Sequence, residues 1–199
     1  SIDISFPPLP NLQVTVLTPP TDPASGTHTS ISWTVANNGV GATSAPQWYD
    51  EARLSLNTVW GDADDIVLGT VLNPNYLPAG ESYAQTRSIA FPNGLSGEYY
   101  FLVKTDVYNQ VFENQDEGDN VAVSPLTFIA LTPPPDLRVD NVEAQNLAFS
   151  GQTMSVSWTV SNHGQGRTVE STWYDRVVMS ADDVLGNADD RNMGDFIHH

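Results

Sequence analysis

Residues 31–39, Ile-Ser-Trp-Thr-Val-Ala-Asn-Asn-Gly, return almost unchanged as residues 156–164, Val-Ser-Trp-Thr-Val-Ser-Asn-His-Gly. In both copies apolar side chains alternate with polar ones, which is the pattern of a β-strand that buries one face. The first copy ends on Asn38-Gly39, a turn dipeptide in which glycine accepts a positive φ angle. The stretch therefore predicts a β fold that the chain builds twice.

These two copies belong to a longer repeat with a period of 125 residues. Residues 10–74 align without a gap on residues 135–199, and 24 of the 65 positions are identical. The identities include Trp48-Tyr49-Asp50, which returns as Trp173-Tyr174-Asp175. Such periodicity is the signature of a tandem architecture, in which one structural unit is repeated along the chain.

The strand patterns are short and are separated by turn signals. Outside the repeat core they include residues 83–91, 97–103 and 121–128, and no segment shows the 3.6-residue period of a helix. About seven short strands per copy predict an all-β fold of immunoglobulin-like antiparallel β-sandwich repeats, with the second copy truncated. Because the chain has no cysteine, Trp33 and Trp158 are expected to pack without the disulfide of antibody domains.

The repeat also predicts the domain boundaries. A proline-rich segment, Leu131-Thr132-Pro133-Pro134-Pro135, has the composition of a short, stiff linker. The expected parts are residues 1–10 as the last strand of a preceding repeat or a donor strand plus linker, 11–131 as a complete sandwich, 132–136 as the linker, and 137–199 as the first half of a second sandwich.

The chain is strongly acidic. Its 199 residues include 7 Lys and Arg against 24 Asp and Glu, which gives a formal net charge of −17. So few cationic side chains argue against nucleic acid and against an anionic membrane surface as partners. No apolar run approaches the ~20 residues of a membrane-spanning helix, so membrane insertion is not expected.

Several motifs resemble those of CARDB, the cell-adhesion-related domain found in bacteria. They are the Pro-Asp-Leu, Ser-Gly-Gln-Thr, Val-Ser-Trp-Thr-Val-x-Asn-x-Gly, Trp-Tyr-Asp and Gly-x-Ala-Asp-Asp motifs of the second copy, and residues 77–83, 95–100 and 105–113 of the first. The resemblance covers residues 11–131 fully and 135–199 as a shortened copy. It implies an extracellular sandwich repeated in tandem within large surface proteins, without enzymatic activity, and it transfers no ligand-binding residues.

Two matching acidic loops are candidates for Ca²⁺ binding, because this ion prefers six to eight closely spaced oxygen ligands. The candidate ligands are Asp50, Asn57, Asp62, Asp64 and Asp65 in the first copy, and Asp175, Asp182, Asp183, Asn187, Asp189 and Asp190 in the second. A third acidic cluster comprises Glu113, Asp116, Glu117 and Asp119. The alternative interpretation is that Asp50 and Asp175 accept backbone or Trp hydrogen bonds inside the fold, and that the loops are solvated.

Other kinds of site have weaker support. Trp60 lies in a polar loop and is the best candidate for stacking against a sugar, although an accessory carbohydrate-binding role would need further aromatic side chains nearby. The chain has no nucleophile elbow, phosphate loop or zinc motif, so we expect no catalysis. No Asn-x-Ser/Thr sequon occurs, so any glycan would be O-linked, with Thr18, Thr21, Thr27 and Ser30 as acceptors.

The second copy stops at His199, the equivalent of Pro74, so counterparts of residues 75–130 do not follow it. Three interpretations stay open: the chain is a segment of a longer tandem protein, another copy completes the half domain, or the tail is disordered. In the second case Ile2, Ile4 and Phe6 would form a donor strand, and head-to-tail contacts that do not close would generate a fibre.

Together these observations predict a non-catalytic structural or adhesive repeat module at the surface of a bacterial cell. Its partners would be other copies of itself or adjacent repeats of the same chain. The alternative is a carbohydrate-binding accessory module of a secreted enzyme, with polysaccharide as the partner.

Overall fold

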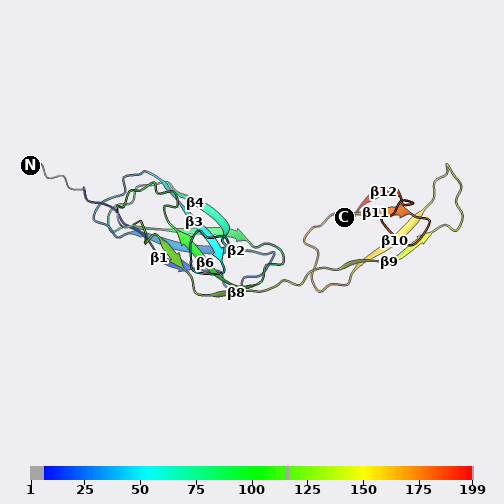
Figure 1. Ribbon diagram of the computed structural model, residues 1–199, viewed down its shortest axis with the longest axis horizontal. Helices are drawn as coiled ribbons and strands as arrows, with labels where there is room; N and C mark the ends of the chain where they lie inside the picture. Colours follow the sequence, from blue (N-terminus) through cyan, green and yellow to red (C-terminus); the bar gives the residue numbers. More distant parts are fainter. Residues whose placement is uncertain (1–6, 115–116, 199) are drawn as a thin grey trace, which may run out of the picture. The chain divides into compact units, whose positions relative to one another are not determined.

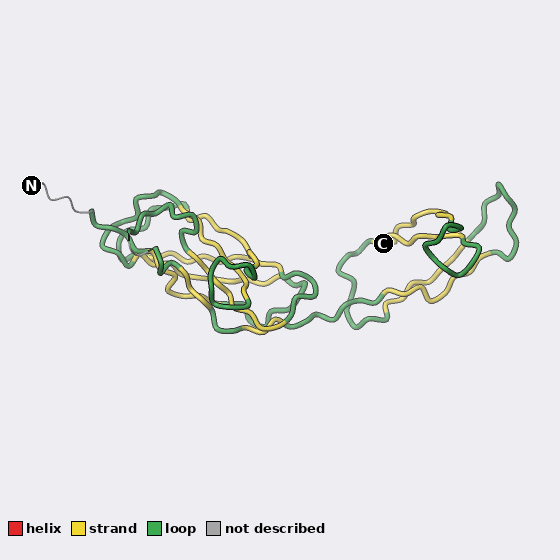
Figure 2. Tube along the Cα trace, viewed as in Figure 1, coloured by secondary structure: helices red, strands yellow, loops and turns green. Residues whose placement is uncertain are grey.

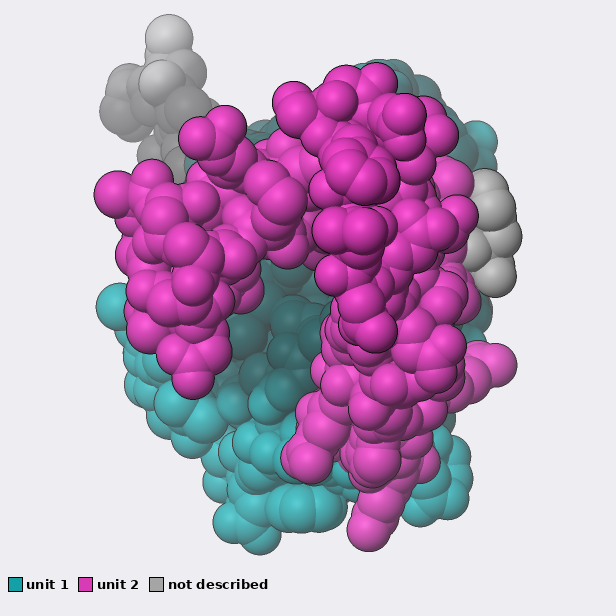
Figure 3. Space-filling view, turned by 90° about the vertical axis from the view of Figure 1, so that its right-hand side faces the viewer, with its two compact units in different colours: residues 1–132 teal, residues 133–199 magenta. Residues whose placement is uncertain are grey.

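The computed structural model describes residues 7–114 and 117–198, and it contains two compact units, Ser1–Thr132 and Pro133–His199 (Figure 3). The predicted donor-strand residues Ile2, Ile4 and Phe6 lie outside the described residues. Every regular element in the described part is a β-strand, and no helix there could cross a membrane. The all-β prediction is confirmed.

The first unit consists of two antiparallel sheets packed face to face (Figure 1). One sheet has the order β1-β2-β5, and the other has the order β4-β3-β6-β7, with β8 also paired to β6. The strands are β1 (Leu12–Thr18), β2 (His28–Asn37), β3 (Trp48–Ser55), β4 (Ile66–Asn73), β5 (Ser82–Ala90), β6 (Gly97–Lys104), β7 (Val121–Val123) and β8 (Thr127–Ile129).

The core of this unit lies between the sheets. The inward side chains of β2 and β3 form its centre, where Trp33 is 2% exposed and Trp48 is fully buried. Phe101 packs edge-on against Phe91 at a centroid distance of 6.2 Å, which joins β6 to the end of β5. Trp33 is therefore buried without a disulfide, as expected, because apolar packing of the two sheets is sufficient to enclose it.

Two strands depart from the predicted pattern. The sequence reading did not single out β4, whose alternation is interrupted at Gly69 beside a bulge between Ala52 and Arg53. The predicted last strand is divided into β7 and β8, because Pro125 has no N–H with which to continue the ladder. At this break the Ser124 side chain replaces a backbone acceptor, since its hydroxyl oxygen accepts the Phe101 N–H at 2.9 Å.

The second unit contains two separate antiparallel pairs (Figure 2). They are β9 (Leu137–Ala144) with β10 (Val156–Asn162), and β11 (Trp173–Met179) with β12 (Arg191–His198). The repeat extends to local detail, because the bulge between Val177 and Val178 matches the one in β3. The same sequence pattern thus builds the same local structure twice.

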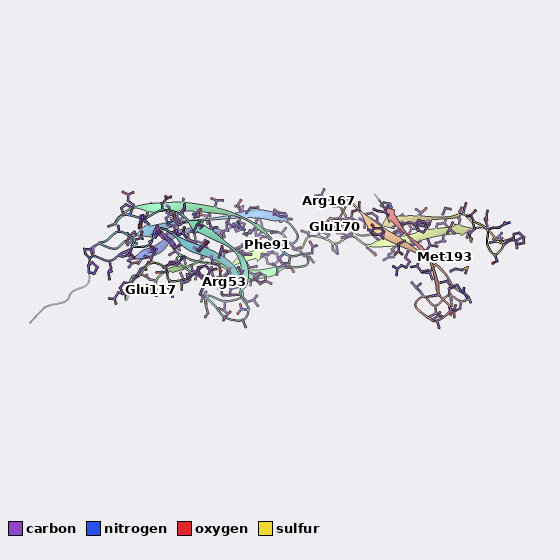
Figure 4. The ribbon with its side chains drawn as sticks, turned by 90° about the horizontal axis from the view of Figure 1, so that it is seen from above. Arg53, Phe91, Glu117, Arg167, Glu170 and Met193 are labelled. Carbon is purple, nitrogen blue, oxygen red and sulfur yellow. The ribbon has the colours of Figure 1, made fainter. Side chains whose placement is uncertain are left out.

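The apolar faces of the second unit are open. None of its described residues is buried, whereas the corresponding positions in the first unit form a closed core. A cleft of about 660 Å³ lies between the strand pairs, lined by side chains that include Val142, Trp158, Met179 and Phe196. Met193, labelled in Figure 4, also lines this cleft.

Candidate functional site

The loop between β3 and β4 is organised around the carboxylate of Asp64. Its Oδ2 accepts hydrogen bonds from the Ser55 hydroxyl at 3.0 Å and the Leu56 N–H at 2.7 Å, and its Oδ1 accepts one from Asn57 Nδ2 at 2.9 Å. Interaction with the Asp62 side chain, followed by the Leu56 hydrogen bond, lowers the pKa of Asp64. The loop therefore holds this carboxylate in its ionised form.

Asp62, Asp64 and Asp65 bring one carboxylate oxygen each to within 4.8 Å of the others. The Asp65 side chain is only 2% exposed. Its Oδ2 accepts from the Gly61 N–H at 2.7 Å, while its Oδ1 is buried and has no hydrogen-bond partner. Since a buried carboxylate oxygen is costly without a partner, this donor set fits a bound hard cation.

Arg53, on β3, is the cation that contacts this loop (Figure 4). Its guanidinium lies 3.1 Å from Asp65 and 2.7 Å from Glu51, and its carbon stands 4.2 Å from the centre of the Trp60 ring. One face of Trp60 is therefore occupied by Arg53 through a cation–π contact. Arg53 was not predicted as part of this site, because the alternation of a strand does not show which loop carboxylates its cation will contact.

The second acidic loop repeats most of this geometry. Asp189 accepts from the Ser180 hydroxyl at 3.0 Å and the Ala181 N–H at 2.8 Å, as Asp64 does in the first loop. Asp190 accepts the Gly186 N–H, and its Oδ1 is again buried without a partner. The second loop lacks the Arg–Trp contact of the first, because Val178 occupies the position of Arg53 and Leu185 occupies the position of Trp60.

One pair of residues exchanges its chemistry between the loops. In the first loop Asn57 Nδ2 donates to Asp62 Oδ2 at 2.8 Å, and in the second Asn187 Nδ2 donates to Asp182 Oδ1 at 3.1 Å. Amide and carboxylate have changed places while the hydrogen bond is kept. The contact is thus part of the loop's architecture, and Asp183 stands outside it as an exposed side chain.

Asp50 and Asp175 lie on their strands and apart from the carboxylate group of the loop. Asp50 is fully buried and accepts hydrogen bonds from Trp33 Nε1 at 2.9 Å, Tyr83 OH at 2.8 Å and Thr105 Oγ1 at 2.8 Å. Asp175 accepts from Trp158 Nε1 at 2.8 Å. Both aspartates thus accept hydrogen bonds from Trp side chains, as the alternative to Ca²⁺ binding supposed. Burial raises the pKa of Asp50, although the hydrogen bonds from its donors lower it.

The third acidic cluster contains a buried carboxyl group. Glu113 is 1% exposed, and its Oε1 accepts the Leu12 N–H at 3.1 Å, which ties the loop after β6 to the start of β1. The pKa of Glu113 is raised to about 8, mainly because its carboxyl group is buried. The negative charges of Glu117, Asp106 and Asp119 raise it further. Sequence proximity placed these acids in one loop but did not distinguish the buried one.

Comparison with known proteins gives one family. The family model of CARDB matches residues 9–124. No curated protein matches the chain.

Solved structures with a similar fold include two determinations of a CARDB domain from Pyrococcus furiosus. The crystal structure, a complex with di-metal ions, is 17% identical and matches 64% of this chain and 100% of that chain, with a TM-score of 0.48. The solution structure is 18% identical and matches 63% of this chain and 99% of that chain, with a TM-score of 0.46. A β-glucosidase from Listeria innocua is 16% identical over 62% of this chain but only 16% of its own, with a TM-score of 0.39.

Proposed function

Because the chain belongs to the CARDB family of non-catalytic, immunoglobulin-like domains, we propose that it is a structural or adhesive repeat module of an extracellular bacterial surface protein. The observation that carries this proposal is the internal repeat. One chain builds the same strands, bulge and loop twice, and a proline segment stands between the two units that contain them. Tandem units of this kind extend a chain by adding modules.

Features of the first unit and of the whole chain suit such a role. The core of the first unit is a continuous set of buried apolar side chains, and with no cysteine in the chain its stability does not depend on disulfide formation. The net charge of −17 disfavours non-specific association between neighbouring molecules. Both properties are useful to a module that is secreted and then displayed at high density.

In this role the partners are adjacent repeats or other copies of the chain. Strand β2 pairs with β5 and β3 pairs with β6 in the first unit, whereas β10 and β11 have no such neighbours among the described residues. Strands of the β5 and β6 kind, from either source, would pair with these edges and cover the apolar cleft. Completion by another copy would produce the head-to-tail fibre considered above.

The test is to locate the natural protein. Immunogold labelling of intact cells with antibodies against residues 11–131, together with protease treatment of the cell surface, should place the protein outside the cell. Electron microscopy of the purified natural polypeptide would show whether it forms fibres. Labelling that appears only after cell lysis would contradict the proposed location.

A second function, divalent cation binding, is favoured by the partnerless Oδ1 of Asp65. Asp62, Asp64 and Asp65 would supply the carboxylate oxygens of a Ca²⁺ site, and the ion would replace Arg53 as the main counter-charge of the loop. A ligand that binds only the folded state stabilises it, by about 2.7 kcal/mol at a concentration 100 times its Kd. The site would therefore stiffen the loop between β3 and β4.

Thermal melts of the whole chain in Ca²⁺ and in EDTA test this site. We expect a higher midpoint in Ca²⁺, and we expect Asp65→Asn to remove the difference. Glu98→Gln, a change of an exposed acid on β6, is the matched control and should keep the difference. Equal midpoints in Ca²⁺ and EDTA for the wild type would exclude the site.

The carbohydrate-binding alternative depends on Trp60. Because Arg53 covers one face of this ring, a sugar could stack only on the opposite face. Polysaccharide pull-down with the wild type and Trp60→Ala tests it, and saturable binding that the substitution abolishes would support the alternative.

A further inference from the structure

The segment that enters each unit lies against an Asn-x-Gly-x-Gly loop of the same unit. We call these loops the sockets, residues 37–41 in the first unit and 162–166 in the second. In the first unit the Val40 and Gly41 N–H groups both donate to the Leu9 carbonyl, at 3.0 and 2.9 Å. The Asn38 N–H donates to the Asn11 carbonyl at 2.7 Å. The entering backbone is thus bound along the whole loop.

A buried asparagine holds the first socket in shape. Asn37 is 0% exposed, and its Oδ1 accepts the Asn11 N–H at 3.0 Å and the Gly39 N–H at 3.1 Å. Its Nδ2 donates to the carbonyls of Gly41 at 2.8 Å and Leu77 at 3.0 Å. One side chain therefore joins the entering segment, the socket and the fold behind it.

The glycines of the socket are needed for close approach. Gly39 does not have the positive φ expected of its Asn-Gly turn, whereas Gly94 does, at 79°. A Cβ atom at Gly39 would lie 2.5 Å from the Leu9 carbonyl oxygen, and one at Gly41 would lie 2.0 Å from that of Pro8. Any larger residue would push the entering segment away.

The second socket repeats these contacts with the segment that leaves the first unit. Asn162 Oδ1 accepts the Asp136 N–H at 2.9 Å, and the Gly166 N–H donates to the Pro134 carbonyl at 3.2 Å. A Cβ atom at Gly166 would lie 1.8 Å from the Pro133 oxygen. The entering segment here is Pro133–Asp136, which is part of the predicted linker, residues 132–136.

The first unit holds the other end of this linker. The Thr132 N–H donates to Ser25 Oγ at 2.9 Å, and the Thr132 hydroxyl donates to the Ser25 carbonyl at 2.6 Å. Ser25 itself is 2% exposed, and its N–H donates to the Ala130 carbonyl at 2.9 Å. The backbone and the side chain of Thr132 are thus both bound by Ser25 of the first unit.

We propose that the socket is a binding site for the proline segment that begins each unit, so that this segment is a bound part of its own unit and not a free tether. Prolines suit this site because their fixed φ reduces the entropy lost when the segment is ordered. The biological purpose of this site rests on the proposed tandem role. Its geometry rests on the contacts that the two units show independently.

Hydrogen exchange of the whole chain tests the socket. In Gly41→Ala we expect the Val40 amide to exchange at least tenfold faster than in the wild type, because its acceptor, the Leu9 carbonyl, is displaced. Gly166→Ala should do the same to the His163 amide, which donates to the Asp136 carbonyl at 2.8 Å. Gly118→Ala is the control, since a Cβ there meets no atom within 4 Å.

Protection of the Ile31–Val35 amides shows whether a variant remains folded. If Gly41→Ala unfolds the first unit, NMR relaxation of the wild type decides, because a bound linker gives Thr132 and Asp136 the order parameters of strand residues, about 0.85. Order parameters below about 0.6 for these residues would overturn the proposal. Unchanged exchange of the Val40 or His163 amide in a folded variant would also overturn it. Neither result bears on where the protein is located, because the labelling of intact cells tests the proposed tandem role separately.

Discussion

Asp50 shows what one carboxylate contributes to a closed sandwich. Trp33, Tyr83 and Thr105 all donate to it, and they come from β2, β5 and the residue after β6. The two sheets are therefore connected through a single acceptor in their shared interior. Asp175 accepts from the equivalent residue, Trp158, but lies in a unit whose core is open.

Replacing Asp50 by Ala would leave these three donors without their shared acceptor. Because buried polar groups that lose a partner cost about 1–3 kcal/mol each, we expect the free energy of unfolding to fall by about 3 kcal/mol or more. Urea denaturation followed by Trp fluorescence measures it, with Glu98→Ala as the exposed control. A loss below about 1 kcal/mol would show that the network contributes little.

Glu113 makes stability depend on pH. Its pKa is about 8 in the folded state, against 4.5 for an unperturbed group. Between these values the folded state binds more protons at Glu113 than the unfolded state, so the contribution of Glu113 to stability is greatest below pH 4.5 and is lost as the pH rises through 8. The charges that face Glu113 belong to Glu117, Asp106 and Asp119.

Glu113→Gln should remove much of this dependence. The Gln oxygen still accepts the Leu12 N–H, but no charge has to be held inside the fold at pH 9. We expect the variant to be more stable than the wild type at pH 9, by on the order of 2 kcal/mol, and similar at pH 4.5. Denaturation at both pH values measures this, and an equal pH slope in both proteins would contradict it.

At the scale of elements, the acidic loops show that a hydrogen bond can be kept while its residues exchange places. Asn57 with Asp62 corresponds to Asp182 with Asn187. Backbone contacts are kept as well, since Val59 N–H donates to Asn57 Oδ1 and Val184 N–H donates to Asp182 Oδ1. The loop needs one amide and one carboxylate, in either order.

The exchange can be tested in the first loop. Asn57→Asp alone places a third carboxylate against Asp62 and Asp64 and removes their donor, so the thermal midpoint should fall. Adding Asp62→Asn re-creates the arrangement of the second loop and should recover most of the loss, with a coupling energy of about 1 kcal/mol. Additive effects of the two substitutions would show that the residues do not act as a pair.

At the scale of the molecule, the two units differ in burial although they share a sequence pattern. Trp33 is 2% exposed, whereas no described residue of Pro133–His199 is buried. The difference follows from β5 and β6, which pair with β2 and β3 in the first unit and have no counterparts among the described residues of the second. Stability should therefore be unequally distributed along the chain.

Hydrogen exchange of the whole chain should reveal this inequality. We expect the amides of β2 and β6 to be protected at least a hundredfold more than those of β10 and β11, because exchange from a poorly buried sheet needs only local opening. The hydrophobic dye ANS should bind the wild type at the open cleft of the second unit. Equal protection of the two units would contradict the expectation.

The elements that depend on local pattern could be predicted from the order of the residues. Alternation at Ile31, Trp33 and Val35 predicted β2, and the 125-residue period predicted that its surroundings would recur. The family resemblance was confirmed by the match over residues 9–124. Missed features, such as β4 and the break at Pro125, lie where a bulge or a proline interrupts the alternation.

The roles of the polar side chains, by contrast, became visible in the folded chain alone. Asp50, Asp65 and Glu113 are all acids near apolar strands, yet one accepts three core donors, one pairs with Arg53 and one holds the start of β1. Their roles depend on which donors the folding of distant segments brings within about 3 Å. That proximity depends on how the sheets pack, and strand alternation contains no information about it.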